Sequence, residues 1–289
     1  MENGGPAFME WAEIAALRPA GLPSGPPGLY VAGTLAGLRA PCAAIVGTRA
    51  ASSGGRSLAR QTAAALARGG VTVVSGLALG IDTAAHLGAL DGDGVTIAVL
   101  GSGHRRLFPP RNAELASRIV ARGGAVCSPY APDCRAYPNQ FLERNGVVAA
   151  FADVVLVVEA PARSGALNTA GWAAGRIPVL AIPGDVDRAS AAGCNALIRD
   201  GATLARHAGD VFEALRLCAA PALPLRAPAS DPLGSTLLKL LDSDPQSLDA
   251  LIETSGALPA AVIARLTMLE LDGAVERREG DVFARTRAP

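Results

Sequence analysis

The sequence predicts an α/β protein: an extended Rossmann-like, doubly wound, mostly parallel sheet followed by a small C-terminal winged-helix domain. Two observations predict the sheet. Short apolar runs alternate with helix-like segments, and the runs are continuously apolar, which is typical of strands buried on both faces. A third observation predicts the winged helix, because the chain ends with three short helical patterns and two strand-like runs.

The predicted elements alternate as strand and helix through most of the chain. Turn residues bound the strand-like runs, which lie at 28–33 (a small edge strand), 43–47, 71–76, 96–101, 125–130, 153–160 and 178–184. Helix-like segments lie at 9–17, 55–69, 82–90, 111–122, 139–150, 166–175, 193–200 and 209–217. The last domain has helical patterns at 234–242, 247–254 and 258–271 and strand-like runs within 274–285. The chain therefore divides into a short N-terminal segment at 1–27, a Rossmann-like domain at 28–218, an Ala/Pro linker at 219–233 and a winged-helix domain at 234–289.

Composition excludes several classes of protein. The formal net charge is zero, which argues against a histone-like polycation but leaves room for a local basic patch. The five cysteines form no CxxC pair and have no histidine at ligand spacing, so neither a metal site nor a disulfide framework is expected. The chain shows no secretory signal pattern and no long apolar run. We expect a reduced, cytoplasmic, soluble protein without a membrane partner.

The loop after the second strand-like run, AAIVGTRAASSGG, is suited to an anion. Gly47 permits close approach of a ligand to the backbone, Thr48 and Ser52 supply hydroxyls, and Arg49 supplies a fork of donors that fits a phosphate. The loop is neither GxGxxG nor a Walker A motif, so we expect no dinucleotide or nucleotide cofactor. The alternative is a plain turn between strand and helix that binds nothing.

The segment SGLALGIDTAAHLGAL places Asp82 as a helix N-cap, with His86 four residues later on the same helix face. Such a pair serves either in catalysis or in fixing a turn against a helix. No serine or cysteine nucleophile stands at a motif position with it, so the structural role is favoured and no catalytic residue is predicted.

Two later segments extend the predicted site. Phe141 precedes Arg144 and Asn145, a combination that can stack on a base while polar groups hold phosphate or sugar. The alternative is that Phe141 belongs to the core. Ser164 and Gly165 form a turn before a helix that begins near Asn168 and Thr169, and a helix N-terminus favours anions.

The C-terminal winged helix carries little positive charge. From residue 219 onward there are seven basic and ten acidic residues, a net charge of −3. The predicted recognition helix has only Arg265 as a cation, and the wing carries Arg277 and Arg278. These three arginines are candidate contacts for a weak interaction with duplex DNA, and a protein-contact role for this domain is an equal alternative.

The order of these motifs resembles the DNA-processing protein A (DprA/Smf) family. The resemblance covers about residues 22–216 and rests on IVGTR, VVSGLALGIDTAAHLGAL, AVLGSG, FPPRN, F-x-x-RN, VVEA…SGALNTA, PVLAIPG and GCN-x-LI-x-x-GA. It implies a cytoplasmic, non-enzymatic protein that binds and protects incoming single-stranded DNA and loads the RecA recombinase in natural transformation and recombination. Residues 1–27 would be a remnant of the N-terminal helical domain common in the family.

The resemblance also implies roles for individual residues. Thr48 and Arg49 would lie in the DNA phosphate pocket, and Phe141 would stack on a base. The remaining matched residues would line the same groove: Arg144, Asn145, Ser164, Gly165 and Thr169. The chain departs from the usual family pattern at Pro129, Glu143 and Gly146, and these departures remove positive charge from the predicted groove.

Two other functions remain to be distinguished from DNA binding. A nucleotide-processing enzyme of the lysine-decarboxylase-like Rossmann group would need a PGGxGT-type loop with a catalytic glutamate, whereas this chain reads SGALNT, with Glu159 before the loop. A transcription regulator would use the winged helix on duplex DNA. For the leading hypothesis, a homodimer through the Rossmann-like domain would join two grooves and raise avidity.

Overall fold

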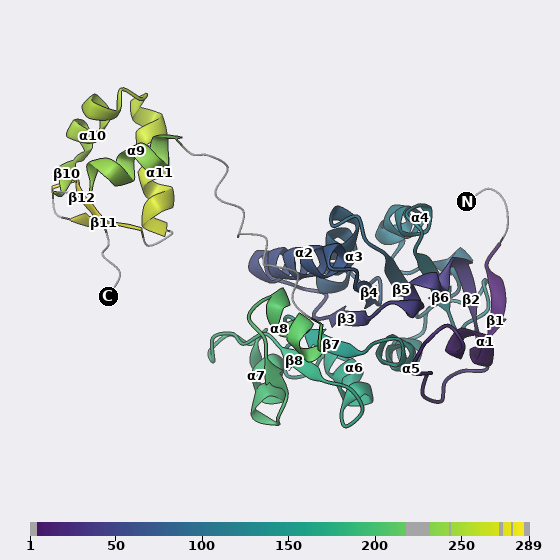
Figure 1. Cartoon of the computed structure of the whole chain (residues 1–289). Helices are drawn as coiled ribbons and strands as arrows, with labels where there is room; N and C mark the ends of the chain where they lie inside the picture. The colour runs from purple at the N-terminus through teal and green to yellow at the C-terminus, as the bar shows by residue number, and fades with distance from the viewer. Residues whose placement is uncertain (1–4, 218–231, 243, 272–273, 279, 286–289) are drawn as a thin grey trace. The chain divides into compact units, whose positions relative to one another are not determined.

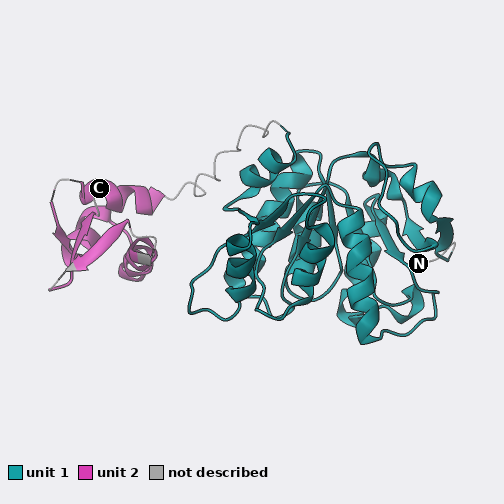
Figure 2. Cartoon of the chain, turned by 90° about the horizontal axis from the view of Figure 1, so that it is seen from below, with its two compact units in different colours: residues 1–221 teal, residues 222–289 magenta. Residues whose placement is uncertain are grey.

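The structure is a computed structural model that describes residues 5–217, 232–242, 244–271, 274–278 and 280–285. The chain divides into two compact units, Met1–Pro221 and Ala222–Pro289 (Figure 2). Most of the predicted Ala/Pro linker falls at 218–231, outside the described residues.

Within residues 5–217, nine strands form one sheet in the order β1-β2-β6-β5-β4-β3-β7-β8-β9 (Figure 1). The strands are β1 Ala7–Glu10, β2 Gly28–Gly33, β3 Cys42–Val46, β4 Thr72–Ser75, β5 Thr96–Val99, β6 Ala125–Ser128, β7 Val154–Val157, β8 Val179–Ala181 and β9 Thr203–Leu204. The strands from β6 to β9 in this order pair in parallel, and β1 and β2 are antiparallel additions beside β6. The predicted doubly wound, mostly parallel sheet is confirmed.

The strand order has a switch point between β3 and β7. From β3 the chain runs outward through β4, β5 and β6, then returns and places β7 on the other side of β3. In doubly wound sheets ligands bind outside the carboxyl ends of the strands at such a point. The fold therefore directs attention to the loops that follow β3 and β7.

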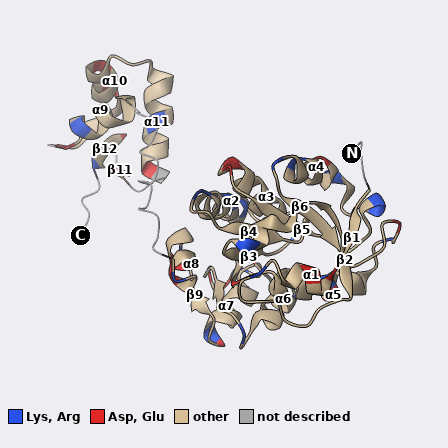
Figure 3. Cartoon of the chain, turned by 45° about the vertical axis from the view of Figure 1, so that its right-hand side comes forward, with Lys and Arg blue, Asp and Glu red and all other residues tan. Residues whose placement is uncertain are grey.

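Helices cover both faces of this sheet. Their bounds are α1 Trp11–Ala15, α2 Ser53–Arg68, α3 Ile81–Asp91, α4 Ala113–Ala121, α5 Pro138–Ala150, α6 Gly165–Ala173, α7 Ala192–Arg199 and α8 Ala208–Ala214. Helices α2, α3 and α4 lie on one face, and α5, α6 and α7 lie on the other (Figure 1). The parallel strands carry no charged residue, so the charges of this part of the chain lie mostly on helices and loops (Figure 3).

Strands buried on both faces explain the continuous apolar runs of the sequence. Along β3, Ala44 and Val46 pack into one core cluster, while Ala43 and Ile45 pack into the cluster on the opposite face. All five residues of this strand are buried. Because alternate side chains point to opposite faces, a strand between two helical layers has no solvent-facing position for a charged residue.

The N-terminal region differs from the sequence expectation. The helix expected at 9–17 spans only Trp11–Ala15, and Ala7–Glu10 is instead a strand that pairs with β2. The edge strand of the sheet is therefore β1, and β2, which was expected at the edge, lies between β1 and β6. Trp11 stacks on Phe151 with ring centroids 5.9 Å apart, which anchors this segment on the core of the first unit.

The second unit has the elements of a winged helix, as predicted. Its described elements are α9 Pro232–Leu240, β10 Gln246–Ser247, α10 Leu248–Ser255, α11 Pro259–Leu271, β11 Val275–Arg278 and β12 Val282–Arg285. The described strands form a sheet in the order β10-β12-β11. A separate apolar core, which includes Leu237, Leu251, Leu266 and Phe283, holds the helices on this sheet.

Within the described residues the cysteines are unpaired, and neither a metal-ligand cluster nor a membrane-spanning helix is present. Cys42, Cys127, Cys134 and Cys194 are free thiols, and Cys218 lies outside this part of the chain. No described group of three or more His, Cys, Asp or Glu side chains is arranged to hold a metal ion. None of the described helices has both the length and the apolar character needed to cross a membrane.

Candidate nucleic-acid interface

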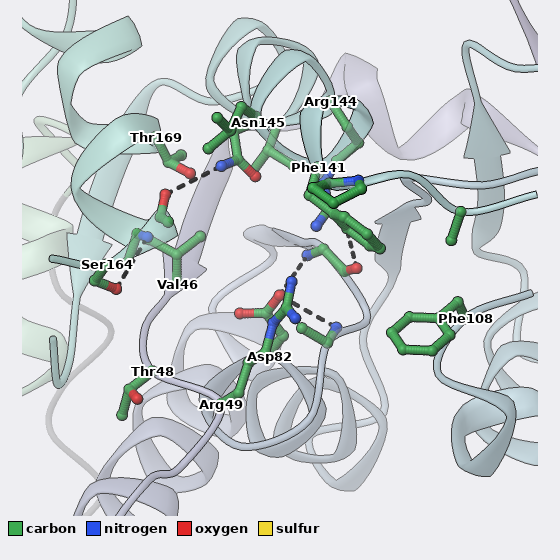
Figure 4. Close-up of a pocket in the computed structure, with 18 of the residues that line it drawn as sticks. Val46, Thr48, Arg49, Asp82, Phe108, Phe141, Arg144, Asn145, Ser164 and Thr169 are labelled. Carbon is green, nitrogen blue, oxygen red and sulfur yellow. Dashed lines mark hydrogen bonds between the residues drawn. The ribbon is translucent and has the colours of Figure 1, made fainter. Parts of the chain in front are cut away.

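A pocket of about 1190 Å³ lies at the switch point (Figure 4). Its described lining comes from the end of β3, from the loops after β3, β4, β5, β6 and β7, and from helices α3, α5 and α6. We call it the switch-point pocket. Arg49 lies near its middle in Figure 4, with Ser164 and Thr169 on one side and Phe141 and Phe108 on the other.

The pocket brings together most of the residues that the sequence assigned to binding. Those that line it are Gly47, Thr48, Arg49, Phe141, Arg144, Asn145, Ser164, Gly165 and Thr169. Ser52 and Asn168 lie outside its lining, but each bonds to a neighbouring residue: Ser52 to Glu159, and Asn168 to Asn145. That these residues contact DNA remains a prediction; their common position is what the structure shows.

The loop after β3 is held on the end of β7. The Thr48 amide donates to the Glu159 carbonyl at 2.7 Å. The Ser52 hydroxyl donates to the Glu159 carboxylate at 3.0 Å and also accepts from the Gly55 amide, which makes Ser52 the N-cap of α2. Burial raises the pKa of Glu159, but hydrogen bonds from Ser190 and Ser52 outweigh it, so the pKa lies below its ordinary value. Ser52 therefore shapes the loop, with its hydroxyl already engaged.

Arg49 rests on an aromatic side chain. Its guanidinium carbon lies 5.0 Å from the centroid of the Phe141 ring, which is within cation–π range. The Phe141 ring meets Phe108 edge to face, with centroids 5.9 Å apart and planes at 62°. The Arg49 residue is exposed, so its donors are available to a ligand in the pocket.

Arg144 lies beneath the pocket and is almost fully buried, with 3% exposure. Its Nη1 donates to the carbonyls of Gly76 and Val99, at the ends of β4 and β5. Burial lowers the pKa of Arg144, and the nearby Asp82 carboxylate opposes that shift. Arg144 therefore ties two strand ends together as part of the pocket floor, and its role as a DNA contact remains a prediction.

The favoured structural role of Asp82 is confirmed, but its partners are backbone amides rather than His86, and it is not the N-cap of α3. Asp82 accepts hydrogen bonds from the amides of Gly76 and Ala78 and so fixes the turn after β4, while Gly80 takes the N-cap position of α3. Burial raises the pKa of Asp82, and the Arg144 charge opposes this. His86 contacts Thr96 instead, as described below.

The His86 Nδ1 lies 2.7 Å from the Thr96 hydroxyl oxygen. Thr96 donates its one hydroxyl proton to the Val73 carbonyl, so His86 Nδ1 must be the donor in its own bond. Nδ1 therefore carries the proton of this bond, and the ring is fully buried. Burial and, to a lesser extent, the Arg144 charge lower the pKa of His86 to about 3.

The wall of the pocket opposite Phe141 is the N-terminus of α6. The Ser164 hydroxyl accepts from the Ala166 amide at 3.2 Å and caps the helix. The Asn145 side-chain amide donates to the Gly165 carbonyl at 3.0 Å and to the Asn168 side chain at 3.2 Å. These bonds join the middle of α5 to the first turn of α6 and so fix the two helices relative to each other at the pocket.

Sequence reasoning missed several lining residues. Arg106, Arg135 and Arg163 are exposed, line the pocket and form no ion pair with a described acidic residue, whereas Arg105 pairs with Asp133. Phe108 was also missed. A usable signal was present, because each of these residues follows the carboxyl end of a parallel strand, where ligands gather. In all, six arginines and one acidic residue, Asp82, are among the described lining residues.

The departures from the family pattern lie outside this lining. Glu143 accepts a hydrogen bond from the Tyr130 hydroxyl at 2.8 Å, and a Cβ at Gly146 would lie 3.3 Å from the Trp172 ring. Neither residue, nor Pro129, is among the described residues that line the pocket. Their effect on charge is therefore exerted beside the pocket, whose charged lining residues are all arginine apart from Asp82.

The candidate duplex contacts belong to the second unit. Arg265 on α11 is half-buried. Arg277 pairs with Asp281, with Nε 3.0 Å from the carboxylate, and lies over the Phe283 ring. Arg278 is in β11, but its side chain lies outside the described residues. The ion pair partly neutralises Arg277, one of the three candidates.

The fold and the position of the pocket define a class: Rossmann-like, doubly wound α/β proteins with an appended winged helix and a basic pocket at the switch point. Comparison with known proteins gives the family. Residues 14–216 match the sequence family DNA recombination-mediator protein A, and residues 220–281 match the DprA winged helix domain. The chain belongs to the DNA recombination-mediator protein A family.

Individual relatives agree with this assignment. A Mycobacterium tuberculosis protein that bears the name DNA processing protein DprA is 42% identical over 246 residues, which cover 82% of this chain and 63% of that protein. The structure of DNA processing protein A from Streptococcus pneumoniae is 33% identical with a TM-score of 0.64, over 72% of this chain and 74% of that chain. The structure of DNA processing protein A from Helicobacter pylori is 28% identical with a TM-score of 0.63. The match covers 73% of this chain and 95% of that chain.

Proposed function

We propose that this protein is a non-enzymatic, cytoplasmic binder of single-stranded DNA that protects incoming DNA and loads the RecA recombinase in natural transformation and recombination. One observation carries the proposal: a single basic pocket joins Arg49, Phe141 and the N-terminus of α6 at the switch point of the sheet. The structure of the Helicobacter pylori relative was described for its single-stranded DNA binding mode, which supports the same ligand here.

The chemistry of the pocket suits a nucleic-acid strand without regard to sequence. Arg49 provides charged donors for backbone phosphate, and the first turn of α6 provides backbone amides and its positive helix end. Aromatic rings supply stacking surfaces that accept every base. Six arginines against one acid among the described lining residues favour a polyanion over a neutral ligand.

Binding through Arg49 is tested by a salt titration of fluorescein-labelled oligothymidine with wild type and Arg49→Ala. We expect the variant to bind at least about ten-fold more weakly, with a log–log salt slope shallower by about 0.7, the value for one lost phosphate contact on single strands. The matched control is Arg68→Ala, because Arg68 is an exposed arginine in the last turn of α2, outside the pocket lining. Equal affinity and slope in wild type and Arg49→Ala would refute this site.

The RecA partner and the homodimer through the Rossmann-like domain are separate parts of the proposal. Two pockets on one dimer would raise the affinity for strands long enough to reach both. We expect wild type, but not Arg49→Ala, to accelerate RecA filament formation on DNA coated with single-strand-binding protein. Light scattering at several concentrations measures the dimer.

Release of free base from nucleoside monophosphates would instead support the nucleotide-processing enzyme.

A further inference from the structure

Trp172 is an exposed tryptophan on α6, just outside the switch-point pocket. Tryptophan side chains are highly buried on average, whereas Trp172 is 56% exposed. It lies one helical turn after Thr169, which lines the pocket. Three residues advance an α-helix by about 5 Å, and residues with this spacing share a face. Trp172 is therefore the next side chain on that face of α6 beyond the pocket lining.

One face of the indole ring of Trp172 is covered by α5. An ideal Cβ at Gly146 would lie 3.3 Å from Cε2 and 3.4 Å from Cδ2 of Trp172. These two atoms are shared by both rings of the indole, so Gly146 contacts the face of the ring system rather than its edge. A side chain at position 146 would push the indole away from α5. Glycine therefore lets the indole lie on the helix, with its other face towards solvent.

Helices α5 and α6 connect this ring to the pocket. Leu142 lines the pocket, is 47% exposed and lies one turn before Gly146 on α5. Asn145 also lines the pocket, and its bond to the Gly165 carbonyl holds α5 and α6 side by side (Figure 1). A strand that leaves the pocket over these two helices therefore meets Trp172 next.

The charges near the ring favour a polyanion. Helix α6 carries no charged residue, and Glu143, the acidic residue of α5, accepts from the Tyr130 hydroxyl at 2.8 Å. Arg163 is exposed before the start of α6 and lines the pocket. Arg176 is exposed after the end of α6, where its Nη2 donates to a backbone carbonyl of α5 at 2.8 Å. Trp172 therefore lies on a helix with an exposed arginine beyond each of its ends.

We propose that Trp172 is a second stacking platform, which binds a base of the strand just outside the switch-point pocket, and that Gly146 seats its indole ring. Phe141 is the stacking ring inside the pocket. This inference rests on the proposed binding of single-stranded DNA. Gly146 is one of the positions at which the chain lacks the positive charge usual in the family. An aromatic surface thus replaces a phosphate contact at this place, and its contribution to affinity releases no counterion.

Intrinsic fluorescence tests whether a base stacks on this ring. The chain has two tryptophans, Trp172 and Trp11, and Trp11 is stacked on Phe151. A base that stacks on Trp172 quenches its emission, so we expect unlabelled oligothymidine to quench wild type but not Trp172→Phe. Phenylalanine keeps an aromatic face, so Trp172→Phe should still bind fluorescein-labelled oligothymidine within about three-fold of the wild-type affinity.

Affinity and salt dependence test what the stacking contributes. Trp172→Leu keeps apolar bulk but removes the aromatic face. We expect it to bind long oligothymidine about ten-fold more weakly, and to bind the shortest strands, which fill only the pocket, as tightly as wild type. Its log–log salt slope should equal that of wild type, because no phosphate contact is lost, whereas Arg49→Ala gives a shallower slope. The matched control is Phe8→Leu, because Phe8 is 51% exposed on the edge strand β1.

Gly146→Arg tests the replacement of a cation by an aromatic surface. The new side chain displaces the indole and adds a positive charge beside the pocket. We expect quenching by oligothymidine to be lost and the salt slope to steepen by about 0.7, the value for one added phosphate contact on single strands. Quenching equal to that of wild type would contradict the seating of the indole by Gly146.

The same measurements separate this inference from the proposed function. Equal quenching in wild type and Trp172→Phe, or wild-type affinity in Trp172→Leu at every strand length, would overturn the inference. If Arg49→Ala still bound weakly, the proposed function would stand. Weaker binding of the shortest strands by Trp172→Leu would also overturn it, because Trp172 would then support the pocket itself. Equal binding by wild type and Arg49→Ala would instead reject the proposed function.

Discussion

Arginine has two separate roles at the switch-point pocket, and burial distinguishes them. Three arginines are exposed and line the pocket: Arg49, Arg106 and Arg163. Arg144 is instead buried, and its Nη1 donates to two backbone carbonyls. Asp82 is buried as well and opposes the lowering of the Arg144 pKa. A buried charge of this kind stabilises the fold only while its partner is present.

Replacing Arg144 should therefore impair stability before it impairs binding. Arg144→Met leaves the Gly76 and Val99 carbonyls without their donor and removes the charge that opposes the raised pKa of Asp82, so we expect the free energy of unfolding to fall by about 1–3 kcal/mol. Urea denaturation measures this loss. The control is Arg163→Gln, an exposed variant that should unfold at the wild-type urea concentration yet bind oligothymidine less tightly. Wild-type stability in Arg144→Met would contradict the structural role.

His86 should make folding sensitive to acid. Its folded pKa of about 3 lies below the ordinary 6.5, so the unfolded chain takes up a proton that the folded chain rejects. The stabilising contribution is complete above pH 6.5 and is lost as the pH falls towards 3, at up to about 1.4 kcal/mol per pH unit. Urea unfolding between pH 4 and 7 should show a smaller pH dependence in His86→Asn than in wild type, and an equal pH dependence would contradict this role of His86.

At the scale of elements, the pocket depends on close approach between loops. A Cβ at Gly47 would lie 2.5 Å from Ile81 Cγ1 and 2.8 Å from the Glu159 carbonyl oxygen. Both neighbours are fixed, one in α3 and the other in the backbone after β7. Glycine is thus required where the loop after β3 passes between these two elements.

Alanine substitutions at Gly47 and Gly171 make a matched pair of variants. Gly47→Ala forces the loop after β3 away from β7, so we expect lower stability and weaker binding of oligothymidine. Gly171→Ala adds a Cβ at an exposed position in α6 with no heavy atom within 4 Å. That change should raise stability by up to about 1 kcal/mol through helix propensity and leave binding unchanged. Thermal unfolding measures the stability of both variants, and fluorescence anisotropy measures their binding of oligothymidine. Wild-type stability and affinity in Gly47→Ala would argue against this packing.

The elements that could be predicted from the sequence are those whose burial produces a simple pattern of apolar residues. Strands β3 to β8 appear as apolar runs because both of their faces are covered, and the loops after β3 and β7 stand out because polar groups follow these runs. Strand β1 was missed because AFME is mostly exposed and reads as the start of a helix. Phe108 follows the carboxyl end of β5, so a place near the pocket could have been predicted for it, but its packing against Phe141 depends on tertiary contacts that no local pattern encodes.

At the scale of the whole molecule, each unit holds its own apolar core. The first unit packs helices on two faces of the large sheet, and the second closes its own cluster around Leu237 and Leu266. The described lining of the pocket lies entirely within residues 46–169. Binding of single-stranded DNA by one protomer is therefore expected to need only the first unit.

Removal of the second unit tests this expectation. A chain that ends at Pro221 should fold, and we expect it to bind a short oligothymidine within about three-fold of the full-length affinity, because no phosphate contact of the pocket is removed. Binding to a blunt duplex of equal length is compared in parallel. Loss of duplex binding alone would assign duplex contact to the winged helix, whereas loss of single-strand binding would contradict the separation.

The strand order determines how late during synthesis of the chain the pocket can form. Strand β4 follows β3 closely in the chain, but β7 pairs with the other side of β3 only after β4, β5, β6 and α5 have been synthesised. Contacts between distant segments form late and slowly. A nascent chain therefore exposes Arg49 long before Ser164 and the first turn of α6 exist to face it. We therefore expect tight binding of nucleic acid only in chains whose sheet is already closed around β3.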